Sequence, residues 1–200
     1  MLPPPHQAAT LRLPPECEPA FLERFLKAEA MALWAVRSAQ LQKLPPNVQL
    51  FLRKHEEDEQ DHLKQFESMV GHQSRERERL PVVPRQWPVL AVQLYGYESL
   101  GLEFAKLLAT MRPDLVFILA DEESHVGFFE REIQKILLGD TSAAEQAKIA
   151  ARAWWRKLPR TLDRYLNDKS LDPYRLDIRN AILAAIDLRF ANLELLAVHQ

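Results

Sequence analysis

A five-residue motif that occurs twice constrains the fold of this chain more than any other feature. Residues 58–62 and 121–125 both read Asp-Glu-x-x-His. Residues three positions apart project from one side of an α-helix, so each copy presents its Glu and its His together. Both copies lie in stretches whose apolar residues recur with helical spacing. The fold must therefore accommodate two acidic and two imidazole side chains on the inner faces of two helices.

Four long segments have the apolar periodicity of helices that pack side by side. We predict helices at residues 20–44, 48–70, 89–111 and 114–138. Pro45 and Pro46 end the first segment, Gly71 the second and Gly139 the fourth. Because the chain has only five glycines and no alternating pattern typical of strands, the predicted fold class is all-α.

The first and third of these segments carry further candidate carboxylates. Glu29 falls in the middle of the apolar sector of segment 20–44, where an unpaired carboxylate is costly. Segment 89–111 offers Glu98, which apolar residues surround, and Glu103, which lies on the polar side. The helical wheel favours Glu98, whereas the symmetry of a hairpin with segment 114–138 favours Glu103. We take Glu98 as the candidate and keep Glu103 as its alternative.

Four carboxylates and two imidazoles on the inner faces of four helices make up the ligand set of a di-metal site in a helix bundle. These ligand types suit iron or manganese. Glutamates can bridge two ions and neutralise their charge, and open positions on the ions would accept water, dioxygen or peroxide. The predicted metal ligands, which are also the predicted catalytic residues, are Glu29, Glu59, His62, Glu98, Glu122 and His125.

Two more residues are candidates for the lining of a channel to this site. His55 lies one turn before Glu59 on the same inner face. We interpret it as a core or channel histidine, with a third nitrogen ligand as the alternative. Tyr95 is the second candidate, and ordinary core packing is its alternative.

The chain divides into three parts by composition. Residues 1–19 form a proline-rich N-terminal arm, residues 20–139 the four-helix bundle, and residues 140–200 C-terminal helices that pack on the same domain. The polar segment 71–88 is long enough to run the length of the bundle, which gives two antiparallel hairpins joined by a long crossover. Ser142 and Glu145 form a capping-box pattern that opens a helix to about residue 157. A last helix from 172 to 198 is expected to dock on the bundle, with a homodimer interface as the alternative.

Bulk properties exclude several classes of protein. The net charge of −2 provides no global basic field for nucleic acid. The single cysteine, Cys17, excludes an intrachain disulfide, a thiolate zinc site and an iron–sulfur module within this chain. No apolar run approaches the roughly 18–20 residues of a membrane span, and the N-terminus lacks a signal pattern. The expected location is the cytoplasm.

Over residues 20–138 the ordered set Glu, Glu-x-x-His, Glu, Glu-x-x-His resembles the ferritin-like superfamily of non-haem di-iron carboxylate proteins. This resemblance implies a ferritin-like four-helix bundle. The chain lacks the four-cysteine module usual in rubrerythrins, extends further after the bundle than storage ferritins, and is shorter than fatty-acid desaturases. Its size and its Glu98 to Glu103 spacing are similar to those of the tRNA hydroxylase that modifies a prenylated adenosine.

The resemblance also implies how the histidines are oriented. A metal-bound His usually donates its second ring N–H to a carboxylate. In related two-fold sites this carboxylate comes from the opposite helix, so we expect Asp121 to support His62 and Asp58 to support His125. The alternative is that both aspartates are solvated helix charges.

The function implied by the resemblance is that of an O2-activating di-iron oxidase or monooxygenase. It would use two iron ions, or a manganese–iron pair, with O2 as co-substrate. The implied partners are a small organic substrate or a modified RNA base, and an external ferredoxin or reductase as electron donor. Two alternatives stay open: a ferroxidase or rubrerythrin-like peroxide-detoxifying protein, and a non-catalytic helical interaction protein.

Overall fold

A computed structural model describes residues 11–74 and 82–196 of the chain. Within these residues every regular element is helical, with seven α-helices and three short 3₁₀ helices, which confirms the all-α prediction. None of the helices in the described ranges is long and apolar enough to cross a membrane. The four longest are α1 (Glu18–Gln40), α2 (Pro46–Val70), α3 (Trp87–Met111) and α4 (Val116–Leu138).

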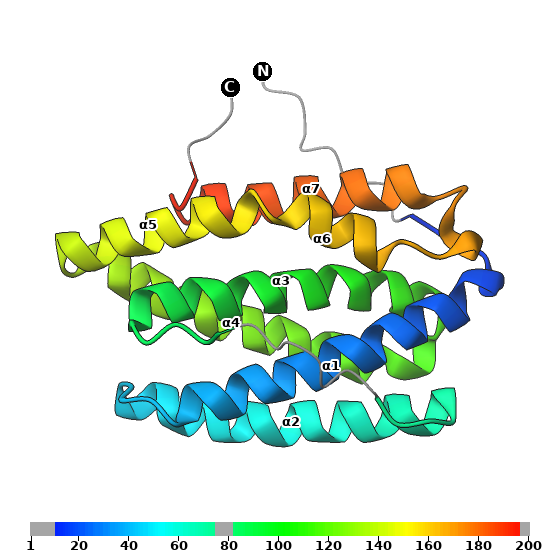
Figure 1. Cartoon of the computed structure of the whole chain (residues 1–200), viewed down its shortest axis with the longest axis horizontal. Helices are drawn as coiled ribbons and strands as arrows, with labels where there is room; N and C mark the ends of the chain where they lie inside the picture. The colour runs from blue at the N-terminus through cyan, green and yellow to red at the C-terminus, as the bar shows by residue number, and fades with distance from the viewer. Residues whose placement is uncertain (1–10, 75–81, 197–200) are drawn as a thin grey trace.

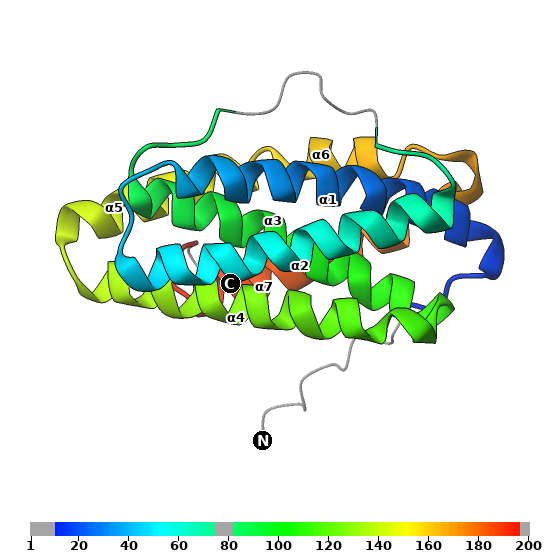
Figure 2. The ribbon, with the colours of Figure 1, turned by 90° about the horizontal axis from the view of Figure 1, so that it is seen from below.

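These four helices form a bundle of two antiparallel hairpins (Figures 1 and 2). Helix α1 packs along α2 and α3 packs along α4, while α1 also contacts α3 and α2 also contacts α4. Helix α2 ends and α3 begins at opposite ends of the bundle, so these two helices run parallel (Figure 2). The predicted crossover includes residues 75–81, which lie outside the described residues.

Three C-terminal helices form a further layer on the α3–α4 pair (Figure 1). They are α5 (Thr141–Trp155), α6 (Leu158–Tyr165) and α7 (Arg175–Asn192). Helix α5 packs on both α3 and α4, and α7 packs on α3 and α6. Gly96 of α3 allows this close approach, because a Cβ at that position would lie 2.3 Å from the Trp154 ring of α5. Helix α3 therefore lies between two layers and is buried on most sides.

Prolines determine where the first hairpin begins and turns. Helix α1 starts at Glu18 rather than at residue 20, because Pro19 fits the first turn of a helix, where its missing N–H costs no hydrogen bond. It ends at Gln40, four residues before the predicted end. Leu44 precedes Pro45, and a residue before a proline disfavours the helical conformation, so the chain leaves the helix and turns before Pro45. Helix α2 begins with Pro46 and is closed by Gly71 at a φ of 82°, a left-handed cap that suits glycine.

The helix boundaries in the C-terminal part differ from the prediction. Helix α5 is capped by Asp140, whose side chain accepts a hydrogen bond from the Ala143 N–H at 2.8 Å, so the expected Ser142 capping box is wrong. The last helix, predicted from residue 172 to 198, is present but shorter: α7 begins at Arg175 and ends at Asn192. It is preceded by the 3₁₀ helix η3 (Lys169–Leu171) and a turn. The other two 3₁₀ helices are η1 (Pro15–Cys17) and η2 (Pro113–Leu115).

The described end of the proline-rich arm packs against the protein. Leu13 and Cys17 are both buried, and the Cys17 thiol donates to the Ser170 carbonyl at 3.5 Å. Residues 1–10 of the arm and the predicted end of the last helix at 198 lie outside the described residues.

Apolar side chains fill the interior on either side of a polar middle section. Phe25 of α1 stacks on Phe66 of α2 with ring centroids 5.0 Å apart, and Phe21 packs on Phe104 of α3. Eight glutamate and histidine side chains from α1 to α4 are buried, and all of them except Glu132 belong to this middle section. Burying charged groups is costly unless they are paired or bind a metal, so this polar section requires an explanation.

Candidate metal centre

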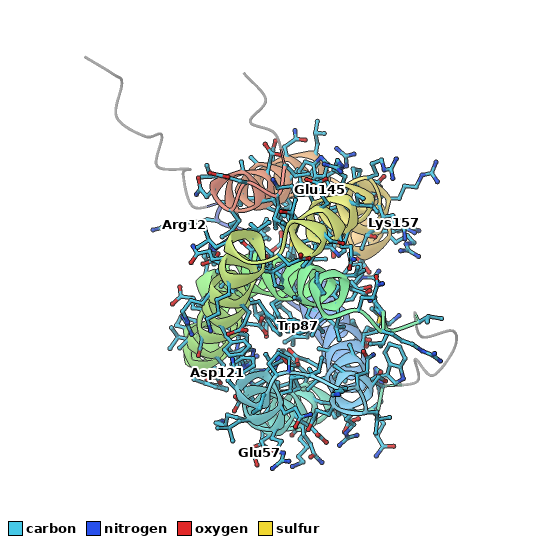
Figure 3. The ribbon with its side chains drawn as sticks, turned by 90° about the vertical axis from the view of Figure 1, so that its left-hand side faces the viewer. Arg12, Glu57, Trp87, Asp121, Glu145 and Lys157 are labelled. Carbon is cyan, nitrogen blue, oxygen red and sulfur yellow. The ribbon has the colours of Figure 1, made fainter. Side chains whose placement is uncertain are left out.

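The bundle brings all six predicted metal ligands into its interior. Helix α1 provides Glu29, α2 provides Glu59 and His62, α3 provides Glu98, and α4 provides Glu122 and His125. Each of the six is at most 4% exposed. In the end-on view of Figure 3, α1 to α4 surround this interior, and Glu57 lies on the outer side of α2. The periodicity of the sequence thus separates inward from outward acidic residues on α2.

The buried residues fall into two groups, each able to surround an ion. His55, Glu59, Glu98 and His125 offer ligand atoms that all lie within 4.8 Å of one another. Glu29, His62 and Glu122 do the same. Glu59 lies next to both groups, because its carboxylate raises the pKa of Glu29 and its Oε1 lies 2.8 Å from Nε2 of His55. The first group can hold a metal ion, and the second lies next to it through this glutamate.

Each motif histidine contacts an aspartate on the opposite helix. The Nε2–H of His62 donates to Oδ2 of Asp121 at 3.1 Å, and the Nε2–H of His125 donates to Oδ2 of Asp58 at 3.4 Å. Both contacts cross between α2 and α4 in the pairing expected from the sequence. A proton held on Nε2 by an aspartate leaves Nδ1 as the nitrogen that faces into the bundle and that would bind a metal ion.

The Nδ1 atoms of His62 and His125 have the surroundings of metal-binding atoms. Both are buried and have no hydrogen-bond partner among the described residues. Nδ1 of His62 lies 3.7 Å from Oε2 of Glu29, and Nδ1 of His125 lies 3.5 Å from Oε2 of Glu98. Buried polar atoms are rarely left without partners, so these two unpaired atoms facing carboxylates fit a site built for metal ions.

His55 adds a third imidazole to the cluster. From the sequence, His55 has this role only as the alternative to a core or channel histidine. Its Nε2 lies 2.8 Å from Oε1 of Glu59 and 3.4 Å from Oε2 of Glu98, and its ring centroid is 3.9 Å from that of His125. It belongs to the cluster rather than to a channel lining. Its four-residue spacing from Glu59 on the inner face was the available signal. Unlike the motif histidines, His55 has no aspartate on its second ring nitrogen, and that Nδ1 is unpaired within the described residues.

Two other sequence candidates lie away from the cluster. Glu103 accepts a hydrogen bond from Lys106 at 2.7 Å, so Glu98 is the carboxylate that α3 provides. Tyr95 is fully buried, stacks on Phe190 of α7 and donates its hydroxyl to Glu130 at 3.1 Å. Tyr97, two residues further on, lines the cavity beside the cluster instead.

Burial raises the pKa of two of the glutamates. For Glu29, burial acts together with the neighbouring Glu59 carboxylate, and the pKa rises well above its usual value. For Glu122, burial acts together with Glu98 and Glu59 in the same direction. Both glutamates therefore take up a proton more readily than a solvated glutamate when only protein groups surround them.

The other four groups form two opposed charge pairs. Burial opposes ionisation of Glu98, but the nearby positive charges of His55 and His125 outweigh it and lower the pKa to about 2. Burial also opposes a charge on His55 and His125, but the facing carboxylates raise their pKa values to about 9 and about 10. The Glu59 pKa is lowered, because its bond with His55 outweighs burial. These two carboxylates and two imidazoles thus balance each other's charge when only protein groups surround them.

A cavity of about 60 Å³ reaches the cluster from the side of α1 and α3. Glu29, Glu59, Glu98 and Glu122 line it, and none of the histidines does. Gly101 of α3 provides the space next to Glu122, since a Cβ there would lie 2.9 Å from the Glu122 Oε2. A space of this size holds a few water molecules or a molecule as small as dioxygen.

The histidine side of the cluster is closed by aromatic rings. Phe51 of α2 stacks on Phe128 of α4 with centroids 3.6 Å apart and meets the His125 ring edge-on at 6.0 Å. Phe129 packs against Phe51 and His55. The cavity therefore reaches the cluster from the side of the carboxylates rather than from the side of the histidines.

Comparison of the chain with protein-family models, with curated proteins and with solved structures finds no match.

Proposed function

We propose that this chain is a ferritin-like di-metal oxidoreductase that activates O2 to oxidise an organic substrate. The observation that carries the proposal is the pair of inward Nδ1 atoms of His62 and His125, each opposite a carboxylate and each backed by an aspartate from the facing helix. An ordinary buried ion-pair network gives no reason for this crossed arrangement. Oxygen and nitrogen donors in these numbers suit iron or manganese.

The residues have distinct roles in this proposal. Glu29, His62 and Glu122 would hold one ion, and His55, Glu98 and His125 the other, with Glu59 between them because it lies next to members of both groups. Two iron ions would supply the electrons that O2 accepts. Asp58 and Asp121 hold the imidazole N–H on Nε2, and the Phe51 and Phe128 rings exclude water from the histidine side.

A second function is favoured by the size of the cavity. A space of about 60 Å³ admits O2 or peroxide but not a bulky substrate without movement of Tyr97 or Leu100. A ferroxidase or peroxide-detoxifying protein needs no larger space. Such a protein would consume O2 or peroxide with Fe(II) alone, whereas an oxidase of organic compounds needs a substrate and an external electron donor for turnover.

Metal analysis tests the proposal. Protein reconstituted anaerobically with Fe(II) should hold two ions per chain, and His62→Ala should lower this number while His72→Ala, at an exposed histidine after the end of α2, should not. Exposure of the loaded protein to O2 with and without candidate substrates then separates the two functions. Less than one transition metal ion per chain would refute both proposed functions and would favour a non-catalytic helical protein.

A further inference from the structure

A second, larger cleft opens on the surface between α3 and the α5–α6 corner. Its volume is about 710 Å³, within the roughly 300–1,000 Å³ range of small-molecule sites. Helix α3 contributes Tyr97 and Leu100 to its wall. The last turn of α5 and the exposed side of α6 contribute the rest, and Lys157 lies on the outside of this C-terminal layer (Figure 3).

The cleft is strongly cationic although the whole chain has a net charge of −2. Four basic side chains line it, and its one acidic residue, Asp163, is already paired with Arg179 at 3.0 Å. The four basic residues are Arg156, Lys157, Arg160 and Arg164. No carboxylate in residues 11–74 or 82–196 lies within 4.0 Å of any of their charged groups. Several unpaired cations around one cleft favour a multiply charged anion, and guanidinium groups match the geometry of phosphate oxygens.

The cleft and the cavity beside the cluster share two wall residues. Tyr97 and Leu100 line both spaces. The outer space is wide and cationic, whereas the inner one is narrow and bounded by Phe25, Ala32 and Phe104 before it reaches the carboxylates. A ligand that occupied both would need a broad anionic end and a slender apolar end.

We infer that the cleft binds the phosphate group of a phosphate monoester whose apolar chain passes Tyr97 and Leu100 toward the metal cluster. Binding of the phosphate in the cleft stands on the cleft alone. The position of the apolar chain as the part to be oxidised rests on the proposed function. The substrate class is thus a phosphorylated compound with an unbranched or slightly branched hydrocarbon end.

Calorimetric titration of the full chain with alkyl phosphates tests the phosphate site. Butyl phosphate should bind, and Arg156→Glu/Arg160→Glu should weaken it by at least about tenfold. The matched control is Lys43→Glu/Arg53→Glu, which makes the same charge change at exposed residues far from the cleft in sequence. Equal weakening in both double variants, or no binding to the natural chain, would overturn the inference. Tighter binding of single-stranded RNA than of butyl phosphate would also overturn it, since it would indicate a nucleic-acid surface.

The length of the alkyl chain tests the passage toward the cluster. Affinity should rise from methyl to butyl phosphate by up to about fourfold per methylene, because each one leaves water. Leu100→Trp, which narrows the passage that both spaces share, should remove this increase. Affinity that is independent of chain length would overturn the passage. Metal content, measured on the same samples, separates the two hypotheses: the cleft variants should keep the metal of the natural chain, and phosphate binding should persist even if the chain proves to hold no metal.

Discussion

Replacing Asp121 tests the crossed arrangement on which the metal site depends. Asp121 is on α4 beside Glu122, yet its carboxylate accepts the N–H of His62 on α2 at 3.1 Å. Removing such a carboxylate from a metal-bound histidine typically weakens metal binding 10–100-fold, which corresponds to about 1.4–2.7 kcal/mol. The group that His62 completes has only one nitrogen, whereas the group of His125 has a second nitrogen from His55. Asp121→Ala should therefore reach the upper part of this range and affect one of the two ions.

The same reasoning gives a smaller effect for Asp58. Its contact with His125 is longer, at 3.4 Å, and its carboxylate is shared with Lys54. Asp58→Ala should weaken binding of the other ion by about tenfold. Both affinities can be measured by competition with a chromophoric chelator.

Asp61→Ala provides the matched control for both substitutions. Asp61 is on α2, is exposed, and pairs only with the nearby Lys64 at 3.0 Å. Its loss should leave both affinities within about twofold, because a surface ion pair of this kind contributes little. If Asp121→Ala and Asp61→Ala gave the same affinities, the crossed contacts would be solvated helix charges and the reasoning would be refuted.

Three further predictions concern packing and protons. Gly96→Ala should destabilise the protein by about 1–3 kcal/mol in chemical denaturation, because its Cβ would lie 2.3 Å from the Trp154 ring. The control, Gly127→Ala, should be neutral or stabilising, because the new Cβ would meet only the end of the Arg131 side chain at 3.4 Å. Gly101→Ala should weaken metal binding in the chelator competition by displacing the Glu122 carboxylate, with little effect on stability in metal-free protein; unchanged affinity would contradict this. Metal uptake should release protons, because burial together with neighbouring carboxylates favours the protonated form of Glu122 and an ion has to displace that proton. Affinity should therefore fall as the pH falls. Calorimetry in two buffers of different ionisation enthalpy measures the release, and a value of zero would oppose the assignment.

The long helices could be predicted from the sequence because their signals are strong and local. Apolar periodicity places α2 and α3 within two residues of their observed starts, and prolines and glycines mark their ends. The predicted start of α5 was wrong because two capping signals overlap in this part of the sequence. Asp140 precedes Ser142 by two residues, and only the folded backbone shows that Asp140 accepts the bond from Ala143.

The site could be predicted where a residue type in a fixed helical spacing carries the information. Glu59 and Glu122 were found because each is followed by a histidine three residues later on the same face. Periodicity shows that His55 is inside the bundle, but not that its Nε2 reaches Glu59 and Glu98. Tyr95 was misplaced for a different reason. Helix α3 contacts α1 on one side and α5 and α7 on others, so an inward position on α3 does not have to face the metal cluster.

The spacing within the cluster distinguishes a metal site from a network of buried ion pairs. Ligand atoms about 2.0–2.2 Å from one ion lie at most about 4.4 Å from each other, and the atoms of each group lie within 4.8 Å of one another, so only small side-chain shifts would be needed to bind an ion. The Nδ1 atom of His125 lies 3.5 Å from Glu98, and that of His62 lies 3.7 Å from Glu29. In a network of ion pairs we would expect these distances to shorten to those of direct hydrogen bonds, because unpaired buried atoms cost free energy. The aspartates on the opposite helices hold the rings back from such closure by bonding to Nε2. The bundle thus keeps two buried ring nitrogens opposite carboxylates without hydrogen-bond partners among the described residues, and this is the physical reason to propose metal binding rather than stability as the role of the cluster.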